Sequence, residues 1–120
     1  MQALVTEVWH AVGEATALPA DGKLAATLGG WRVLVVKTDD GLFALNDRCT
    51  HAASALHDGR LRRGAIMCPL HGARFEVKTG KCLGAEYRSL RMYPVRITDG
   101  MIEVAVPDSV PGMDDLPTFS

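Results

Sequence analysis

Short apolar runs separated by glycine and proline make up most of the chain. The clearest run, Trp-Arg-Val-Leu-Val-Val-Lys at 31–37, is typical of a buried strand. A turn signal, Asp-Asp-Gly at 39–41, and a second apolar run at 42–45 follow it, so the two runs predict a β-hairpin. The same arrangement recurs at 93–98 and 101–106, on either side of Asp-Gly at 99–100.

Weaker runs complete the pattern. Those at 65–67 and 74–77 predict two short strands flanking a loop, and 5–12 predicts one more strand. The sequence contains no amphipathic helix above ten residues, although 15–17 and 52–56 are each compatible with a single helical turn. Many short strands at this spacing predict an all-β fold, an antiparallel β-sandwich or small barrel.

Composition narrows the class of protein. A length of 120 residues fits one domain. The chain has 13 basic and 14 acidic residues, and such a balanced charge argues against non-specific binding of nucleic acid. No apolar stretch approaches a membrane span, and the N-terminus lacks the features of a signal peptide, so we expect a cytoplasmic protein with no membrane partner. Three cysteines cannot form a fully paired disulfide framework, so they need a packing role or a metal.

The end of the chain differs from the rest. From residue 99 onward there are five acidic residues and no lysine or arginine, and prolines at 107, 111 and 117 interrupt regular structure. We therefore expect one domain at 1–107 and an acidic, proline-containing tail at 108–120 that is loosely held.

Two short segments carry the candidate chemistry. Cys49-Thr50-His51 and Cys68-Pro69-Leu70-His71 each contain one thiol and one imidazole, and each follows a predicted strand. We expect both segments at the tips of hairpins, where they can be brought together around an ion.

Three interpretations of these four residues remain open. They can be unrelated buried cysteines and histidines. They can hold a structural zinc, although common zinc modules pair Cys with Cys and His with His, whereas here the types alternate. They can hold a [2Fe–2S] cluster in which two cysteines bind one iron and two histidines bind the other.

The pattern C-x-H-x16-C-x-x-H resembles that of the Rieske-type iron–sulfur proteins. The likeness extends to Leu-His-Asp-Gly at 56–59, to the second loop at 68–75, and to the turns near 79–81 and 93–100. It implies a Rieske fold with a cluster-binding subdomain at about 47–76, built from two hairpin-tip loops. It also implies one [2Fe–2S] cluster with the ligands Cys49, His51, Cys68 and His71, the histidines binding through Nδ1 with Nε2 facing solvent.

The resemblance also bears on the reduction potential. High-potential respiratory members of the family carry an extra cysteine in each loop, joined as a disulfide, and serine and tyrosine hydroxyls near cluster sulfur. The matching positions here hold Ala53 and Leu70 in place of the cysteines, and Ala73 and Phe75 in place of the hydroxyls. Fewer hydrogen bonds to sulfur disfavour the more negative reduced cluster, so we expect a low-potential ferredoxin.

By this likeness the chain is an electron-transfer protein and not an enzyme. It would pass single electrons from a flavoprotein reductase to a terminal Rieske oxygenase in aromatic hydrocarbon catabolism, through transient contacts. The alternative is a small Rieske subunit of a larger reductase, such as nitrite reductase. A zinc-loaded interaction module is a third possibility.

Charge near the cysteine segments is predominantly positive. Between 48 and 75 the charged residues are Arg48, Arg60, Arg62, Arg63, Arg74 and only one acid, Asp58. These arginines are either solvated or paired with Asp47, Glu76 and Glu86, or they form a basic rim that steers an acidic partner surface to the cluster.

Four other residues receive structural interpretations. We expect His10 and Trp31 to be structural, His57 to be a surface turn residue, and Cys82 to be an ordinary buried thiol.

Overall fold

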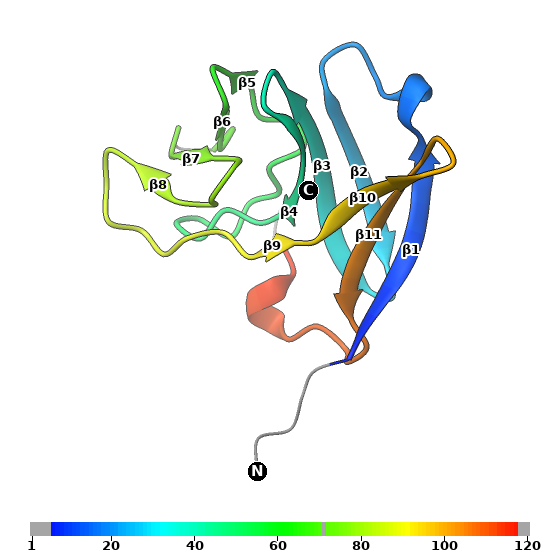
Figure 1. Ribbon diagram of the computed structural model, residues 1–120. Coiled ribbons are helices and arrows are strands. Elements are labelled where there is room, and N and C mark those ends of the chain that lie inside the picture. The colour runs from blue at the N-terminus through cyan, green and yellow to red at the C-terminus, as the bar shows by residue number, and fades with distance from the viewer. Residues whose placement is uncertain (1–5, 71, 118–120) are drawn as a thin grey trace.

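The computed structural model describes residues 6–70 and 72–117. The strands are β1 (Glu7–Glu14), β2 (Lys23–Leu28), β3 (Trp31–Thr38), β4 (Gly41–Asn46), β5 (Leu61–Arg62), β6 (Ala65–Met67), β7 (Arg74–Glu76), β8 (Cys82–Leu83), β9 (Met92–Tyr93), β10 (Val95–Thr98) and β11 (Met101–Pro107). They form an outer sheet β1-β11-β10, a central sheet β2-β3-β4-β9 and a small sheet β5-β6-β7-β8, all antiparallel (Figure 1). The predicted all-β class is confirmed.

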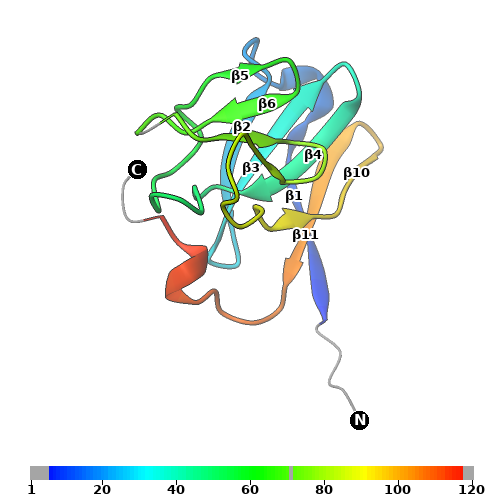
Figure 2. The same cartoon turned by 90° about the vertical axis from the view of Figure 1, so that its left-hand side faces the viewer.

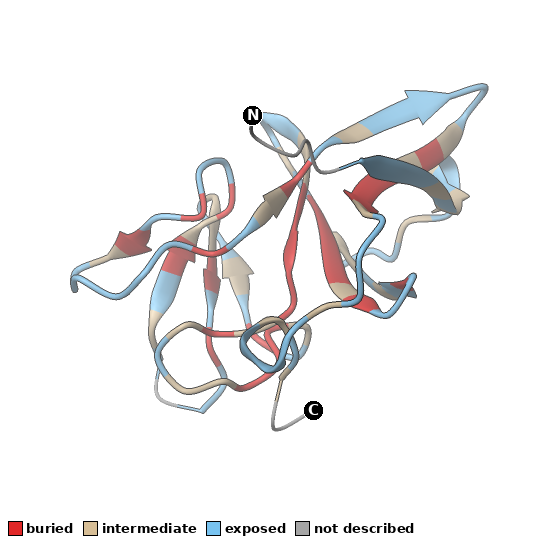
Figure 3. Cartoon of the chain, turned by 90° about the horizontal axis from the view of Figure 1, so that it is seen from below, coloured by how far each residue is buried: buried red, intermediate tan, exposed pale blue. Residues whose placement is uncertain are grey.

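Strand β3 is buried on both faces. Val33 and Val35 pack into a core shared with the outer sheet, whereas Leu34 and Val36 pack into a second core with Phe75 of the small sheet. Buried positions accordingly concentrate along the central strands (Figure 3). Because both faces are buried, the strand is apolar at consecutive positions instead of alternating. Full burial of each such side chain contributes roughly 1.5–3 kcal/mol to stability.

Both predicted hairpins are present. Strand β3 pairs with β4, and β10 pairs with β11 across a turn in which Asp99 has φ 52° and Gly100 has φ 80°. Two central residues with positive φ match the right-handed strand twist. The predicted strand at 93–98 is divided at Pro94, since β9 pairs with β4 whereas β10 pairs with β11. The chain thus passes from the central sheet to the outer sheet at the residue that lacks an N–H.

Some short elements differ from prediction. Strands β2, β5 and β8 were not predicted: β2 is rich in alanine, and the other two have two residues each. Ala15–Ala17 forms a 3-10 turn as expected, but 52–56 contains no helix: Ala52 ends a turn and Ser54 forms an isolated β-bridge. Of the predicted strand at 5–12, Val5 lies outside the described residues. No helix in the described part of the chain has the length and hydropathy needed to cross a bilayer.

The segment after β11 is held against the body of the molecule. Trp31 Nε1 donates to the carbonyl of Ser109 at 2.8 Å, and Asn46 Nδ2 donates to the carbonyl of Asp115 at 2.9 Å. The Asp115 carboxylate also lies 3.4 Å from Arg91 Nε. Figure 2 shows this segment, with the 3-10 turn η2 (Met113–Asp115), crossing the lower end of the molecule. The prediction of a loosely held tail is therefore wrong for 108–117.

Candidate metal centre

The first cysteine segment folds as a tight reversal of the chain. The amide of Cys49 donates to the carbonyl of Ser54 at 2.8 Å, and the amide of Ala53 donates to the carbonyl of Cys49 at 2.8 Å. Ala53 closes the turn with φ 56°, in the left-handed region that a residue with a Cβ rarely adopts.

The second segment repeats these hydrogen bonds. The amide of Cys68 donates to the carbonyl of Ala73 at 2.7 Å, and the amide of Gly72 donates to the carbonyl of Cys68 at 3.0 Å. Gly72 has φ 78° at the position equivalent to Ala53, and a Cβ on it would meet no described neighbour within 4 Å. Glycine is therefore favoured at this position by the positive φ and not by a lack of space. The two turns thus share the same two backbone hydrogen bonds, with a cysteine at the same place in each.

The two turns have different settings in the fold. The second is the tip of the β6–β7 hairpin, in which Met67 pairs with Arg74, as predicted. The first lies in the connection between β4 and β5, which belong to different sheets, so it is not the tip of a β4–β5 hairpin. The small sheet supplies one turn and the connection leading into it supplies the other.

The structure brings the two cysteines together. Their side chains are buried, at 0% and 1% exposure, and both belong to the same core cluster. Burial is the main influence on Cys49 and raises the pKa of its thiol, and Cys68 adds to the rise. The backbone amides of Ala52 and His51 oppose this by hydrogen bonding to the Cys49 sulfur. Those amides stabilise the thiolate, which is the form that binds iron.

The third predicted ligand lies at the surface. His51 is exposed, and its ring stacks on that of Tyr87 with the centroids 4.1 Å apart and the planes inclined by 21°. The hydroxyl of Thr50 donates to the carbonyl of Arg88, which fastens the segment carrying Tyr87 to this turn. The sequence carried no signal for Tyr87, because the segment 84–91 lacks a recognisable motif.

The fourth predicted ligand, His71, lies outside the described residues. Within 6–70 and 72–117, no three His, Cys, Asp or Glu side chains converge closely enough to hold a metal. The described donors are two thiols buried in one core, and an imidazole two residues along from one of them. Two thiolates on an inner iron with imidazoles on an outer iron suit this arrangement of buried sulfur and exposed nitrogen.

A buried carboxylate supports the first turn. Asp47 Oδ1 accepts the amides of Leu56 and His57, at 2.6 and 2.9 Å, and Asp47 Oδ2 lies 2.7 Å from His57 Nδ1. His57 is thus partly buried and paired, which corrects its prediction as a surface turn residue. Sequence reasoning offered Asp47 only as a partner of the arginines and missed this supporting role, although an acid placed directly after an apolar strand is a usable signal.

The turn at 56–59 is fixed to the central sheet. Lys23 Nζ on β2 donates to the carbonyl of His57 at 2.8 Å and to the carbonyl of Gly59. A Cβ on Gly59 would lie 1.9 Å from the carbonyl oxygen of Met67, so no larger residue fits there without a shift of backbone. The connection between the two cysteine turns is therefore fixed in two ways: Lys23 binds its carbonyl groups, and Gly59 packs closely against the backbone of Met67.

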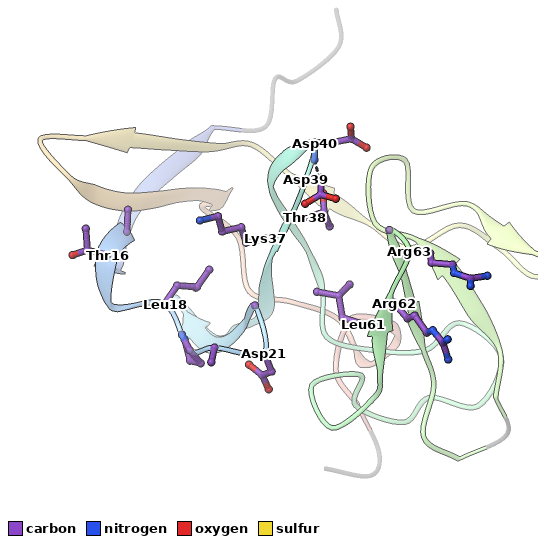
Figure 4. Close-up of a pocket in the computed structure, with 15 residues that line it drawn as sticks. Thr16, Leu18, Asp21, Lys37, Thr38, Asp39, Asp40, Leu61, Arg62 and Arg63 are labelled. Carbon is purple, nitrogen blue, oxygen red and sulfur yellow. Dashed lines mark hydrogen bonds between the residues drawn. The ribbon is translucent and has the colours of Figure 1, made fainter.

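The other singled-out residues are structural. Cys82 is buried in the core that contains Cys49 and Cys68, and Trp31 is buried in the opposite core, as predicted. A groove of about 710 Å³ lies between η1 (Ala15–Ala17), the β3–β4 turn and the β5–β6 hairpin. Leu61 points into this groove, whereas Arg62 and Arg63 point away from it (Figure 4). None of the three described ligand candidates, Cys49, His51 and Cys68, lines it.

The chain is similar to known iron–sulfur proteins. Residues 8–105 match the family described as Rieske-like [2Fe-2S] domain. The anthranilate 1,2-dioxygenase ferredoxin subunit of Burkholderia cepacia is 35% identical over 100 residues, covering 82% of this chain and 92% of the relative. A chain in the complex of reduced oxygenase and oxidized ferredoxin of carbazole 1,9a-dioxygenase superposes with TM-score 0.76 at 26% identity, covering 88% of this chain and 100% of that one.

A second kind of neighbour has a similar fold. A chain assigned as the NADH-dependent nitrite reductase small subunit of Mycobacterium tuberculosis superposes with TM-score 0.74 at 25% identity, covering 84% of this chain and 96% of that one. The family match spans nearly the whole described domain and includes both cysteine turns. The chain therefore belongs to the Rieske-type [2Fe–2S] ferredoxins.

Proposed function

We propose that this chain is a one-electron carrier that receives electrons from a flavoprotein reductase and passes them to a terminal oxygenase. The observation that carries the proposal is the burial of Cys49 and Cys68 in one core, on two turns with matching backbone hydrogen bonds, beside an exposed His51. The ferredoxin subunits and components of dioxygenase systems among its relatives support the pathway.

The proposed ligands are Cys49 and Cys68 for the inner iron, and His51 and His71 for the outer iron. The bound cluster would supply reversible one-electron chemistry. The chain's own residues exclude water from the two sulfurs and hold one imidazole at the surface. A partner would therefore approach the His51 side, where the path for the electron is shortest.

A low reduction potential is part of the proposal. Phe75 is buried in the core that contains the cysteines, and Ala73 packs against that core. Neither side chain has a hydroxyl, so neither can donate a hydrogen bond to a cluster sulfur. When the reduced cluster is less stabilised, its reduction potential is lower, so we expect a value near the lower end of the range for Rieske centres, roughly −150 mV. Such a potential suits donation to an oxygenase. The proposed location is the cytoplasm, where free thiols such as Cys82 stay reduced.

Anaerobic purification followed by reconstitution tests this function. We expect a red-brown protein that bleaches on reduction and gives the EPR signal of a cluster with two histidine ligands. Added to a reductase and a terminal oxygenase with NADH, it should restore hydroxylation of an aromatic substrate that neither enzyme performs without it. A colourless, zinc-containing protein would contradict the proposal.

The alternative is a small subunit of a larger reductase, which the similarity to the nitrite reductase subunit favours. Size-exclusion chromatography with a candidate large subunit separates the two functions. A carrier elutes alone at micromolar concentration, whereas a permanent subunit co-elutes.

A further inference from the structure

One face of the small sheet is basic. Successive side chains along a strand point to opposite faces. Ile66 and Phe75 point into the core, so their neighbours Met67 and Arg74, which pair with each other, lie on the outer face. Leu83 pairs with Arg74 and continues this face onto β8.

Four arginines surround a shallow hollow of about 290 Å³ on that face. We call them the arginine face: Arg60, Arg62, Arg63 and Arg74. Ala65, Met67 and Leu83 form its apolar floor, and Met67 is 37% exposed.

The arginine face has no internal counter-charge in the described residues. None of the four guanidinium groups makes a hydrogen bond or an ion pair there. Two acids that the sequence offered as partners are used elsewhere, because Asp47 pairs with His57 and Glu76 accepts the hydroxyl of Thr79 at 2.7 Å. The positive charge of this face is therefore available to another molecule.

The arginines differ in their distance from the second cysteine turn. Arg74 begins β7 directly after the turn, and the amide of Met67, the residue before Cys68, donates to the carbonyl of Arg60 at 2.9 Å. Arg62 and Arg63 lie at the β5–β6 turn, at the opposite end of β6, and their side chains extend to the same side (Figure 4). Arg60 and Arg74 are thus the inner pair.

We infer that the arginine face binds an acidic, carboxylate-rich segment of the redox partner, with an apolar side chain of that segment resting on Met67. This inference rests on the proposed function. The arginines sit on strands β5 and β7 and on the residues flanking β5, and neighbouring strands are about 4.8 Å apart, so the charges are spread over a surface wider than one phosphate. All four side chains belong to exposed residues, and the floor is apolar, which fits a polypeptide better than a small anion.

Titration of the full, cluster-loaded chain with hexaglutamate tests the inference, with calorimetry as the readout. At low salt we expect measurable binding that weakens steeply at 200 mM salt, because exposed charges are screened over about 10 Å. Arg60→Glu with Arg74→Glu should weaken binding about tenfold or more, since two attractions become two repulsions. Arg60→Gln with Arg74→Gln is the milder form, for use if the reversal disturbs folding.

The matched control is Lys78→Glu with Lys81→Glu, which changes net charge equally at the exposed β7–β8 turn. Binding by this control should stay within twofold of the parent. An equal loss in both double variants would overturn the inference in favour of net charge alone, and tighter binding of inorganic pyrophosphate would overturn it in favour of a small-anion site.

The rate of electron transfer to the terminal oxygenase provides a second test. The Arg60/Arg74 variant should reduce the terminal oxygenase more slowly than the parent at low salt and at an unchanged reduction potential, and Arg62→Glu with Arg63→Glu should have a smaller effect. Unaltered rates at every salt concentration would overturn the inference and leave the carrier function standing. A parent that holds no cluster would instead refute the proposed function, while hexaglutamate binding would still report on the arginine face.

Discussion

Asp47 and His57 lie 2.7 Å apart, Oδ2 to Nδ1, at the two ends of the segment that contains Cys49 and His51. The other carboxylate oxygen of Asp47 accepts two backbone amides, so one buried side chain closes the loop with three hydrogen bonds. The geometry of the first cysteine turn therefore depends on a residue that binds no metal.

Removal of this carboxylate should destabilise the protein. Asp47→Ala leaves the amides of Leu56 and His57 without an acceptor, so the free energy of unfolding should fall by about 2–4 kcal/mol. Asp47→Asn keeps one oxygen for the amides and should cost about 1 kcal/mol. Urea unfolding of the two variants measures the difference, and equal losses would show that the amides find other partners.

Gly59→Ala should be more disruptive than its small volume implies. The new Cβ would lie 1.9 Å from the carbonyl of Met67, which forces the backbone to move, and we expect a loss of about 4 kcal/mol or failure to fold. Gly100→Ala is the control, because its Cβ would meet nothing within 4 Å and only its positive φ is strained, at about 1 kcal/mol. Thermal unfolding compares them. A similar melting temperature in both would contradict the steric argument.

Tyr93 should make stability fall at alkaline pH. Burial raises the pKa of its hydroxyl to about 12, whereas an unfolded tyrosine ionises near 10. Between these values the unfolded chain loses the proton and the folded chain keeps it, so stability present below pH 10 is lost as the pH rises to 12. The total loss is about 2–3 kcal/mol. Tyr93→Phe should remove this part of the pH dependence, and parallel curves for parent and variant would refute it.

Restored hydroxyls should raise the reduction potential. Ala73→Ser and Phe75→Tyr place donors where the high-potential relatives have them, and a hydroxyl aimed at sulfur favours the more negative reduced cluster. Protein-film voltammetry of each single variant and of the double variant measures the shift. Thr79→Ser, in the exposed β7–β8 turn, is the control and should leave the potential unchanged. A parent already near the upper end of the Rieske range would contradict the low-potential assignment.

Loss of a histidine ligand should remove the cluster and spare the fold. For His51→Ala and for His71→Ala we expect loss of visible absorption while circular dichroism keeps most of its β signal, because the described residues of both cores around β3 are hydrophobic side chains and do not include His51, which is exposed. His10→Gln, on β1, is the matched control and should keep both signals. Rieske-type EPR that persisted in His71→Ala would exclude that residue as a ligand.

The sequence predicted what local pattern encodes. The consecutive apolar residues of β3, the Asp99-Gly100 turn and the cysteine spacing each carry their information within a few positions, and the structure contains the corresponding strand, the hairpin and two cysteines buried in one core. Strand β2 escaped prediction because alanines carry little β preference, and only pairing with β3 makes it a strand.

Long-range polar contacts could not be predicted from the sequence for a different reason. Lys23 binds carbonyls more than thirty residues away, and Asn46 and Arg91 hold Asp115 at the end of the chain. Such partners are chosen by the completed fold, so an acidic segment with prolines was interpreted as loose when its backbone is in fact hydrogen-bonded.

The burial of β3 in two cores has a consequence for local opening. Its amides cannot reach solvent by loosening either outer layer alone, since the other layer still covers the strand and β2 and β4 still pair with it. In native-state hydrogen exchange, the β3 amides should therefore exchange only through global unfolding, whereas those of the two-residue strands β5 and β8 open in smaller fluctuations. The slowest-exchanging amides would then report the stability of the whole chain.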